Sequence, residues 1–354
     1  MAIDFPNSPA LDQEFTSAGV TWKYDGQKWV SQAAGGSPGT SYWDRTGTTL
    51  SPANAGDDVV VDGDIQTTSL NGGPLAGFRN LLVNGSFNNW QRGTSITSPA
   101  TGNTIFVYGS DRWLFGAGTN KSITMQRNVG APAGFATCGL TTIPADRSFT
   151  CRQRIEQLNS QGMESGDHTF SVYLRSSAAV SGVLRWSAAT TADDFATLTD
   201  LGQTAISLPG DDTWHRYSTL VPADSAFANG AEVRFVIPAG NACTLRYTGA
   251  QLEPGPVATP FSQRPIGLEQ QLCARYYQTV PGKQQLFAAN SNTTIKTIAY
   301  ARPVVMRIDP TETGVASIGT PAFAGTKEGI SINASPVSQG QASFISNYTA
   351  DAEL

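Results

Sequence analysis

The sequence predicts an all-β protein built from several small domains. Its 354 residues include 36 glycines and 20 prolines, a composition that favours turns and short strands over long helices. Charged residues make up only 14% of the chain, against about 25% in an average soluble protein. Many short segments alternate polar and apolar residues with a period of two, the pattern of half-buried strands. We therefore expect hairpins and sandwiches and very little helix.

The first segment, residues 1–32, is predicted to be a hairpin that attaches the chain to a partner. Trp22 and Tyr24 alternate with polar residues, and the Asp-Gly pair that follows is a strong turn signal. Trp29 lies on the returning strand, where aromatic side chains can pair across the ladder. So short a segment cannot bury all its aromatic side chains internally. The predicted attachment residues are Phe5, Pro6, Phe15, Trp22, Tyr24 and Trp29.

A linker and a stalk are predicted to follow this anchor. Residues 33–41 are mostly Ala, Gly, Ser and Pro, a composition typical of a flexible linker. Residues 42–79 contain short alternating pieces without a self-contained apolar core. Strands of this kind gain a shared interior when three copies wrap about one axis. We therefore predict a β stalk at 42–79 and an elongated homotrimer.

Two further β domains are predicted beyond the stalk. Residues 80–265 carry many strand-like segments, and 169–175 and 232–237 both alternate with period two, which predicts a β-sandwich. Residues 266–354 are predicted to hold a short helix and a C-terminal β domain. In that helix Leu268 and Leu272 lie four residues apart, which predicts one apolar stripe.

Composition and motifs disfavour several classes of function. The net charge is -5 and no dense run of Lys or Arg occurs, so nucleic acid is not an expected partner. The four cysteines lack metal-ligand spacing and are expected to be buried free thiols. No nucleophile-elbow, phosphate-loop or zinc-protease motif occurs, so neither an enzyme nor a cofactor is expected. Without a signal-peptide pattern or a long apolar run, we expect synthesis in a host cytoplasm and no membrane insertion.

A family resemblance covers roughly residues 78–278. The run NLLVNGSFNNWQRGTS at 80–95, with SDRW at 110–113, resembles a module common in bacteriophage tail fibre and tail appendage proteins. The module usually ends with a set of pieces that this chain carries in the same order: QLEPG at 251–255, ATPF at 258–261, RP at 264–265 and EQQLCARYY at 269–277. The N-terminal hairpin resembles the leading segment of many cyanophage virion proteins.

The resemblance has implications for fold, metal and location. The module is similar to jelly-roll carbohydrate-binding modules, which implies a jelly-roll sandwich that binds sugar. Such modules often carry a structural calcium near their first strand, which would implicate Asn84, Ser86 and Glu253, although an acidic residue often stands at the position of Ser86. The two likenesses together imply a fibre whose N-terminus lies in the virion tail and whose C-terminal part faces the host.

The glycan-contacting residues are predicted from the remaining tryptophans and polar segments. Trp90 and Trp113 belong to the framework motifs, and Trp214 lies in an alternating segment, so all three are expected in the core. Trp186 precedes a small, polar segment, 187–194, that could form the rim of a shallow ligand face. Adjacent aspartates are more often turn formers than catalytic pairs. The candidate glycan contacts are Trp186, Arg185, Asp193 and Asp194.

Three functions are compatible with these features. The first is a homotrimeric tail fibre that attaches to tail or baseplate proteins by its N-terminus and binds host surface polysaccharide weakly but at many sites. The second is a non-adhesive tail or baseplate structural protein. The third is a polysaccharide depolymerase, which would need long repeats and clustered carboxylates that this sequence lacks.

Overall fold

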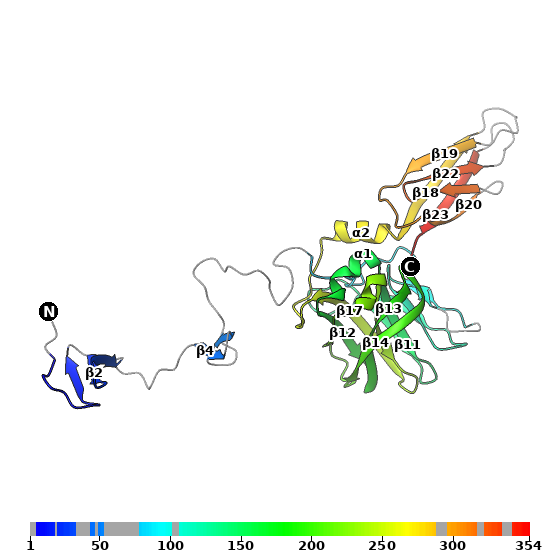
Figure 1. Ribbon diagram of the computed structural model, residues 1–354. Coiled ribbons are helices and arrows are strands. Elements are labelled where there is room, and N and C mark those ends of the chain that lie inside the picture. Colours follow the sequence, from blue (N-terminus) through cyan, green and yellow to red (C-terminus); the bar gives the residue numbers. More distant parts are fainter. Residues whose placement is uncertain are drawn as a thin grey trace. The chain divides into compact units, whose positions relative to one another are not determined.

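A computed structural model of the protein shows a chain that divides into two compact units, Met1–Gln66 and Thr67–Leu354 (Figure 1). The structure describes residues 5–17, 20–32, 43–46, 49–52, 78–100, 106–287, 296–316, 322–334 and 342–354. The predicted linker at 33–41 and most of the predicted stalk at 42–79 lie outside these residues. Homotrimer formation therefore stays a prediction.

The first unit contains the hairpin that the sequence predicts. Its strands are β1 (Glu14–Ser17), β2 (Val20–Tyr24) and β3 (Trp29–Gln32), which form one antiparallel sheet in the order β1-β2-β3. The turn between β2 and β3 is held by Asp25, whose carboxylate accepts hydrogen bonds from the backbone amides of Gln27 and Lys28. Gly26 has a φ of 95°, a conformation that glycine adopts without strain. A second hairpin joins β4 (Trp43–Thr46) to β5 (Thr49–Pro52).

The second unit is built around a β-sandwich of two six-stranded antiparallel sheets, as predicted (Figure 1). One sheet, with the order β15-β12-β17-β10-β9-β6, consists of His215–Val221, His168–Ser176, Cys243–Pro254, Cys138–Ile143, Thr124–Asn128 and Ser95–Thr97. The other sheet, with the order β14-β13-β16-β11-β8-β7, consists of Asp194–Leu208, Val180–Thr191, Ala231–Ile237, Phe149–Ile155, Leu114–Gly116 and Val107–Tyr108. Consecutive strands often change sheet, so the two layers share one core.

The core between the sheets is rich in aromatic rings. Phe87 stacks on Trp113 with a ring separation of 4.7 Å, and Tyr247 lies edge-on to Phe87 at 5.2 Å. Trp113 is fully buried, which confirms its predicted core position, whereas Trp90 and Trp214 are half-buried. Trp214 immediately precedes β15 instead of lying inside a strand. The four cysteines are buried and free, as predicted.

Short helices lie at one end of the sandwich (Figure 1). They are α1 (Gln157–Ser160), the 3-10 turns at Gln161–Glu164 and Ser225–Asn229, and α2 (Ile266–Ala274). The helix α2 confirms the predicted element, but the predicted apolar stripe is not its most buried part. Leu268 and Leu272 are only half-buried, and the buried side chains are Glu269 and Cys273. Glu269 is tolerated there because Arg264 pairs with it at 3.2 Å.

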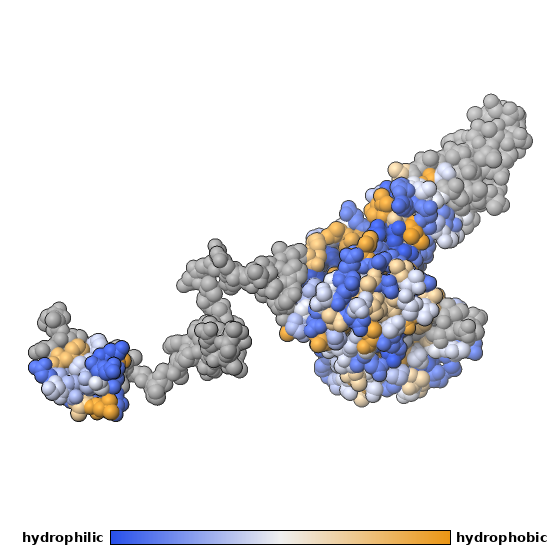
Figure 2. Space-filling view, in the orientation of Figure 1, coloured by the Kyte–Doolittle hydropathy of each residue, from blue (hydrophilic) through white to orange (hydrophobic). Residues whose placement is uncertain are grey.

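A C-terminal β region follows α2. One three-stranded sheet has the order β18-β23-β20, with strands Tyr277–Phe287, Ala342–Asp351 and Thr311–Ala316. The other has the order β19-β22-β21, with strands Lys296–Ala301, Gly329–Ala334 and Ala322–Gly325. No helix among the described residues is long and apolar enough to cross a membrane. The visible surface of the second unit is largely hydrophilic, with small apolar patches (Figure 2).

Candidate functional site

The candidate site is built on the turn that follows Asn84. This residue has a φ of 56°, which asparagine tolerates better than most side chains. Its Oδ1 atom accepts hydrogen bonds from the backbone amides of Asn88 and Asn89, at 2.9 and 3.0 Å. Its Nδ2 atom donates to the backbone oxygen of Asp111 at 3.0 Å. The asparagine therefore fixes the path of the chain through residues 88–91.

A cavity of about 430 Å³ lies beside this turn, and a second of about 520 Å³ is lined by Arg92 and residues of the C-terminal region. The smaller one is lined by Asn88, Asn89, Trp90, Gln91, Gln270 and Ala274, the last two of which belong to α2. Trp90 is half-buried, and its indole Nε1 donates to the backbone oxygen of Phe87 at 2.6 Å. This bond fixes the orientation of the ring. We call this cavity the Trp90 cavity.

The amide side chains around the Trp90 cavity are held by bonds that leave part of each amide free. Asn88 accepts from the hydroxyl of Thr137 at 2.8 Å through Oδ1. Gln91 donates through Nε2 to Asp111 and to the backbone oxygen of Tyr277, both at 3.0 Å. The opposite ends of these two amides, Nδ2 of Asn88 and Oε1 of Gln91, have no hydrogen bond among the described residues. The cavity thus combines an oriented indole with preorganised donors and acceptors.

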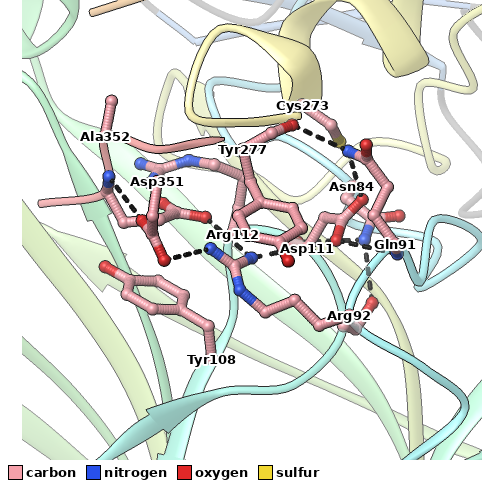
Figure 3. Close-up of polar contacts among 12 residues, drawn as sticks. Asn84, Gln91, Arg92, Tyr108, Asp111, Arg112, Cys273, Tyr277, Asp351 and Ala352 are labelled. Atoms are coloured by element: carbon pink, nitrogen blue, oxygen red, sulfur yellow. Dashed lines mark hydrogen bonds and ion pairs between the residues drawn. The ribbon is translucent and has the colours of Figure 1, made fainter. Parts of the chain in front are cut away.

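A network of charged residues joins the sandwich to residues 351–354 (Figure 3). The guanidinium of Arg92 lies 3.6 Å from the ring centroid of Tyr277 and pairs with Asp351 at 3.0 Å. Arg92 also pairs with the buried Glu353 at 3.3 Å, and Arg112 pairs with the same carboxylate. These contacts border the larger cavity, which is lined partly by Arg92, Tyr277, Asp351 and Glu353.

Asp111 links this network to the Trp90 cavity and makes stability depend on pH. Burial raises the pKa of Asp111 to about 6, against the opposing effect of hydrogen bonds from Gln91. Between about pH 4 and pH 6 the folded protein holds a proton that the unfolded chain releases. The free energy of unfolding should therefore fall as pH rises through this window, by about 1 to 3 kcal/mol. In Asp111→Asn, urea denaturation at several pH values should no longer show this fall in the free energy of unfolding. An unchanged fall would contradict the raised pKa of Asp111.

The residues predicted to contact glycan do not form one surface. Trp186 belongs to the core, only 7% exposed, with its ring packed over Gly202. Arg185 lies on the opposite, outer face, because successive side chains of a strand alternate. Residues 187–191 continue β13 instead of forming the predicted polar rim. A sequence of small and polar residues resembles a loop, but pairing with β14 and β16 extends the strand.

The two aspartates predicted beside Trp186 have structural roles. Asp193 has a φ of 56° and lies in the turn between β13 and β14. Its carboxylate accepts from the backbone amide of Gln157 at 2.7 Å, at the start of α1. Asp194 accepts from the backbone amide of Ala196 at 2.9 Å. Both side chains thus stabilise the local backbone, the role that adjacent aspartates most often have.

The predicted calcium residues belong to separate hydrogen-bond networks. Asn84 is buried and engaged in the turn described above. Glu253 is buried and accepts from the side chain of Arg79 at 3.2 Å and from the backbone amide of Thr259 at 2.8 Å. Ser86 is buried, and its backbone oxygen accepts from Thr248. Within the described residues, no group of three or more His, Cys, Asp or Glu side chains could hold a metal ion. A cation beside Glu253 already neutralises its carboxylate, so these residues do not fit a calcium site.

The predicted attachment residues pack against one another in the first unit. Phe5 stacks on Trp29 at 5.5 Å and meets Trp22 edge-on at 5.2 Å. Phe15 lies 5.6 Å from Phe5, and Tyr24 lies 5.5 Å from Trp29. All of these residues, with Pro6, remain half-buried. The rings therefore form a small cluster whose partner contact stays a prediction.

The sequence predicted a core position for Trp90, because a tryptophan inside a framework motif is more often part of a core, but the structure places it half-buried at the edge of a cavity. A signal was nevertheless present. Asn88, Asn89 and Gln91 flank Trp90 in the chain, and amide residues are unusual neighbours for a core tryptophan. The contribution of Gln270 carried no such signal, because it comes from a helix far along the chain.

Among known proteins, the chain shows similarity only to solved structures. No protein-family model matches the chain, and no curated protein matches it. A CBM4 structure is 12% identical over 48% of this chain and 97% of its own, with a TM-score of 0.31. The CBM22-1 xylan-binding domain of Xyn10C from Paenibacillus barcinonensis is 7% identical over 52% of this chain and 100% of its own, with a TM-score of 0.32. The enzymatically active domain of tailspike protein 4 from bacteriophage CBA120 is 13% identical over 49% of this chain but only 21% of its own, with a TM-score of 0.31. Scores this low carry no function from those proteins to this one.

Proposed function

We propose that this chain is an adhesive structural protein of a bacteriophage tail and that its sandwich binds surface glycan at the Trp90 cavity. The observation that supports glycan binding is a cavity lined by the half-buried Trp90 together with Asn88, Asn89, Gln91 and Gln270. An aromatic ring can stack on the apolar face of a sugar, and amides can donate to and accept from its hydroxyl groups. A cavity of about 430 Å³ has the size of a small-ligand site.

The wider role as a tail fibre is supported by the organisation of the chain. The first unit is compact and built around partly exposed aromatic rings. A segment so small gains stability by docking onto a larger partner, here a tail or baseplate protein. Three copies in one fibre would present three weak glycan sites to one surface, and multivalency would supply the avidity. The chain acts by adsorption, without a covalent step.

Glycan binding is tested with the full chain on an array of neutral oligosaccharides, followed by calorimetric titration of the best ligand. Gln270 is exposed on α2, so Gln270→Ala should preserve the fold. We expect about fivefold weaker binding, the worth of one neutral hydrogen bond. Trp90→Ala should weaken binding by at least about tenfold, because it removes the stacking surface.

The matched control is Gln161→Ala, which removes another exposed glutamine of the same unit, outside the cavity. It should leave the affinity unchanged. If the chain bound no oligosaccharide on the array, a non-adhesive tail or baseplate protein would be favoured instead. Release of new reducing ends from a bound polysaccharide would favour a depolymerase, and a stable monomer in light scattering would contradict the trimeric fibre.

A further inference from the structure

The outer face of the second sandwich sheet carries three arginines in one row. Arg152 on β11 is directly opposite Arg234 on β16, and Arg234 is directly opposite Arg185 on β13. Neighbouring strands lie about 4.8 Å apart, so the three side chains start close together. Their chain neighbours Cys151, Phe235 and Leu184 face the core, which places the arginines on the outside. We call this row the arginine ladder.

The ladder carries an excess of positive charge that the chain does not fully neutralise. Like charges directly opposite each other destabilise a sheet, so the row requires compensation. The adjacent row, two residues along, runs Arg154, Glu232, Ser187 and Asp200. Four arginines thus face two carboxylates, which leaves two positive charges across the two rows.

The two carboxylates differ in how firmly they hold the arginines. Glu232 is fully buried and pairs with Arg152, Arg154 and Arg234 at 3.0–3.3 Å. Asp200 is 58% exposed in its side chain and pairs with Arg234 at 2.6 Å. The Nε atoms of Arg152 and Arg234 are buried and have no hydrogen-bond partner among the described residues. Asp200 is therefore the more accessible of the two carboxylates.

One arginine of the second row already contacts the C-terminal segment of the described chain. At the far end of the second row, Arg154 donates to the backbone oxygen of Leu354 at 2.6 Å. Glu353 is buried against Arg92 and Arg112 in the same segment. Arg154 therefore already has a partner in this segment. The other end of the ladder lies at the half-buried Arg185 and the exposed Gln203.

From this geometry we infer that the arginine ladder binds the carboxylate of an acidic polysaccharide, with the ligand displacing Asp200 from Arg234. Planar guanidinium groups match carboxylates with two parallel hydrogen bonds. Arg185 and Gln203 lie at the accessible edge, where the ligand enters. The carboxylate of the ligand then pairs with Arg234. Binding at this site depends on the negative charge of the ligand. It involves none of the residues that line the Trp90 cavity.

The probe is tetragalacturonate, compared with its fully methyl-esterified form, titrated calorimetrically into the full chain. The acid should bind at least about tenfold more tightly than the ester, because esterification removes the charge that the ladder recognises. Raising the salt concentration from about 50 mM to about 500 mM should lower the affinity for the acid several-fold, because salt screens the attraction between charges. Equal affinities for acid and ester would overturn the proposal.

Two variants change the affinity in opposite directions. Arg185→Gln removes a partly exposed cation from the ladder and should weaken tetragalacturonate binding about tenfold. Asp200→Asn removes the competing carboxylate and should strengthen it by about threefold to tenfold. Unchanged or weaker binding by Asp200→Asn would overturn the displacement of Asp200, whatever the effect of Arg185→Gln.

The matched control is Arg127→Gln, which removes an exposed arginine from β9 in the other sheet. It should leave the affinity for tetragalacturonate unchanged, and an equal loss with Arg185→Gln would show attraction by overall charge only. Gln270→Ala should also leave this affinity unchanged. Failure of glycan binding at the Trp90 cavity and failure of the ladder are therefore distinguishable.

Discussion

Replacing Gly85 with alanine should destabilise the protein by at least about 3 kcal/mol, measured by urea denaturation. Gly85 lies in the turn that leads to the Trp90 cavity, and its backbone oxygen accepts from the amide of Ala250 at 2.9 Å. A Cβ atom at residue 85 would overlap the carbonyl oxygen of Ala250. Because that oxygen belongs to the central strand β17, the backbone cannot move away without breaking the sheet.

The control for this substitution is Gly267→Ala in α2. Apart from its chain neighbours and the backbone of its own helix, a Cβ atom there meets no atom within 4 Å. Alanine is a better helix former than glycine, so this variant should gain about 0.5 to 1 kcal/mol. A loss of stability at both positions would show that any added methyl group is harmful. Equal stability of Gly85→Ala and the parent protein would contradict the close approach of residues 85 and 250.

Replacing Glu232 with glutamine should cost about 3 to 5 kcal/mol, because it leaves several arginines without their buried counter-charge. Glu232 is fully buried and pairs with Arg152, Arg154 and Arg234. A neutral amide keeps the shape of the side chain but loses the charge, so the effect isolates the electrostatic contribution. Thermal unfolding together with urea denaturation would measure it.

Asp200→Asn is the matched comparison within the same two rows of residues. Its carboxylate is more than half exposed, and water can solvate the arginines that it leaves. Its cost should stay within about 0.5 kcal/mol. If Asp200→Asn were as costly as Glu232→Gln, the exposed carboxylate would be a structural counter-charge. It could then not be the group that an anionic ligand displaces.

Local patterns of the sequence predicted most of the β elements correctly. The Asp25-Gly26 turn, the strands at 169–175 and 232–237, and the helix near Leu268 all follow from short-range preferences. The errors arose where a local pattern was ambiguous. Residues 187–191 look like a loop because they are small and polar, but two neighbouring strands pair with them. The leucine stripe on α2 is only half-buried, because Glu269 and its ion pair with Arg264 occupy the most buried part of that helix.

The sequence by itself determined the β-rich character of the chain and which side chains share a face of each strand, because a period of two is a local property. It also placed an indole among amides at residues 88–91. Only the tertiary structure brought Gln270 to that indole and aligned Arg152, Arg234 and Arg185 in one row. Strand register and the docking of a helix depend on hydrogen bonds and packing between segments far apart in the chain, and no local pattern encodes those contacts.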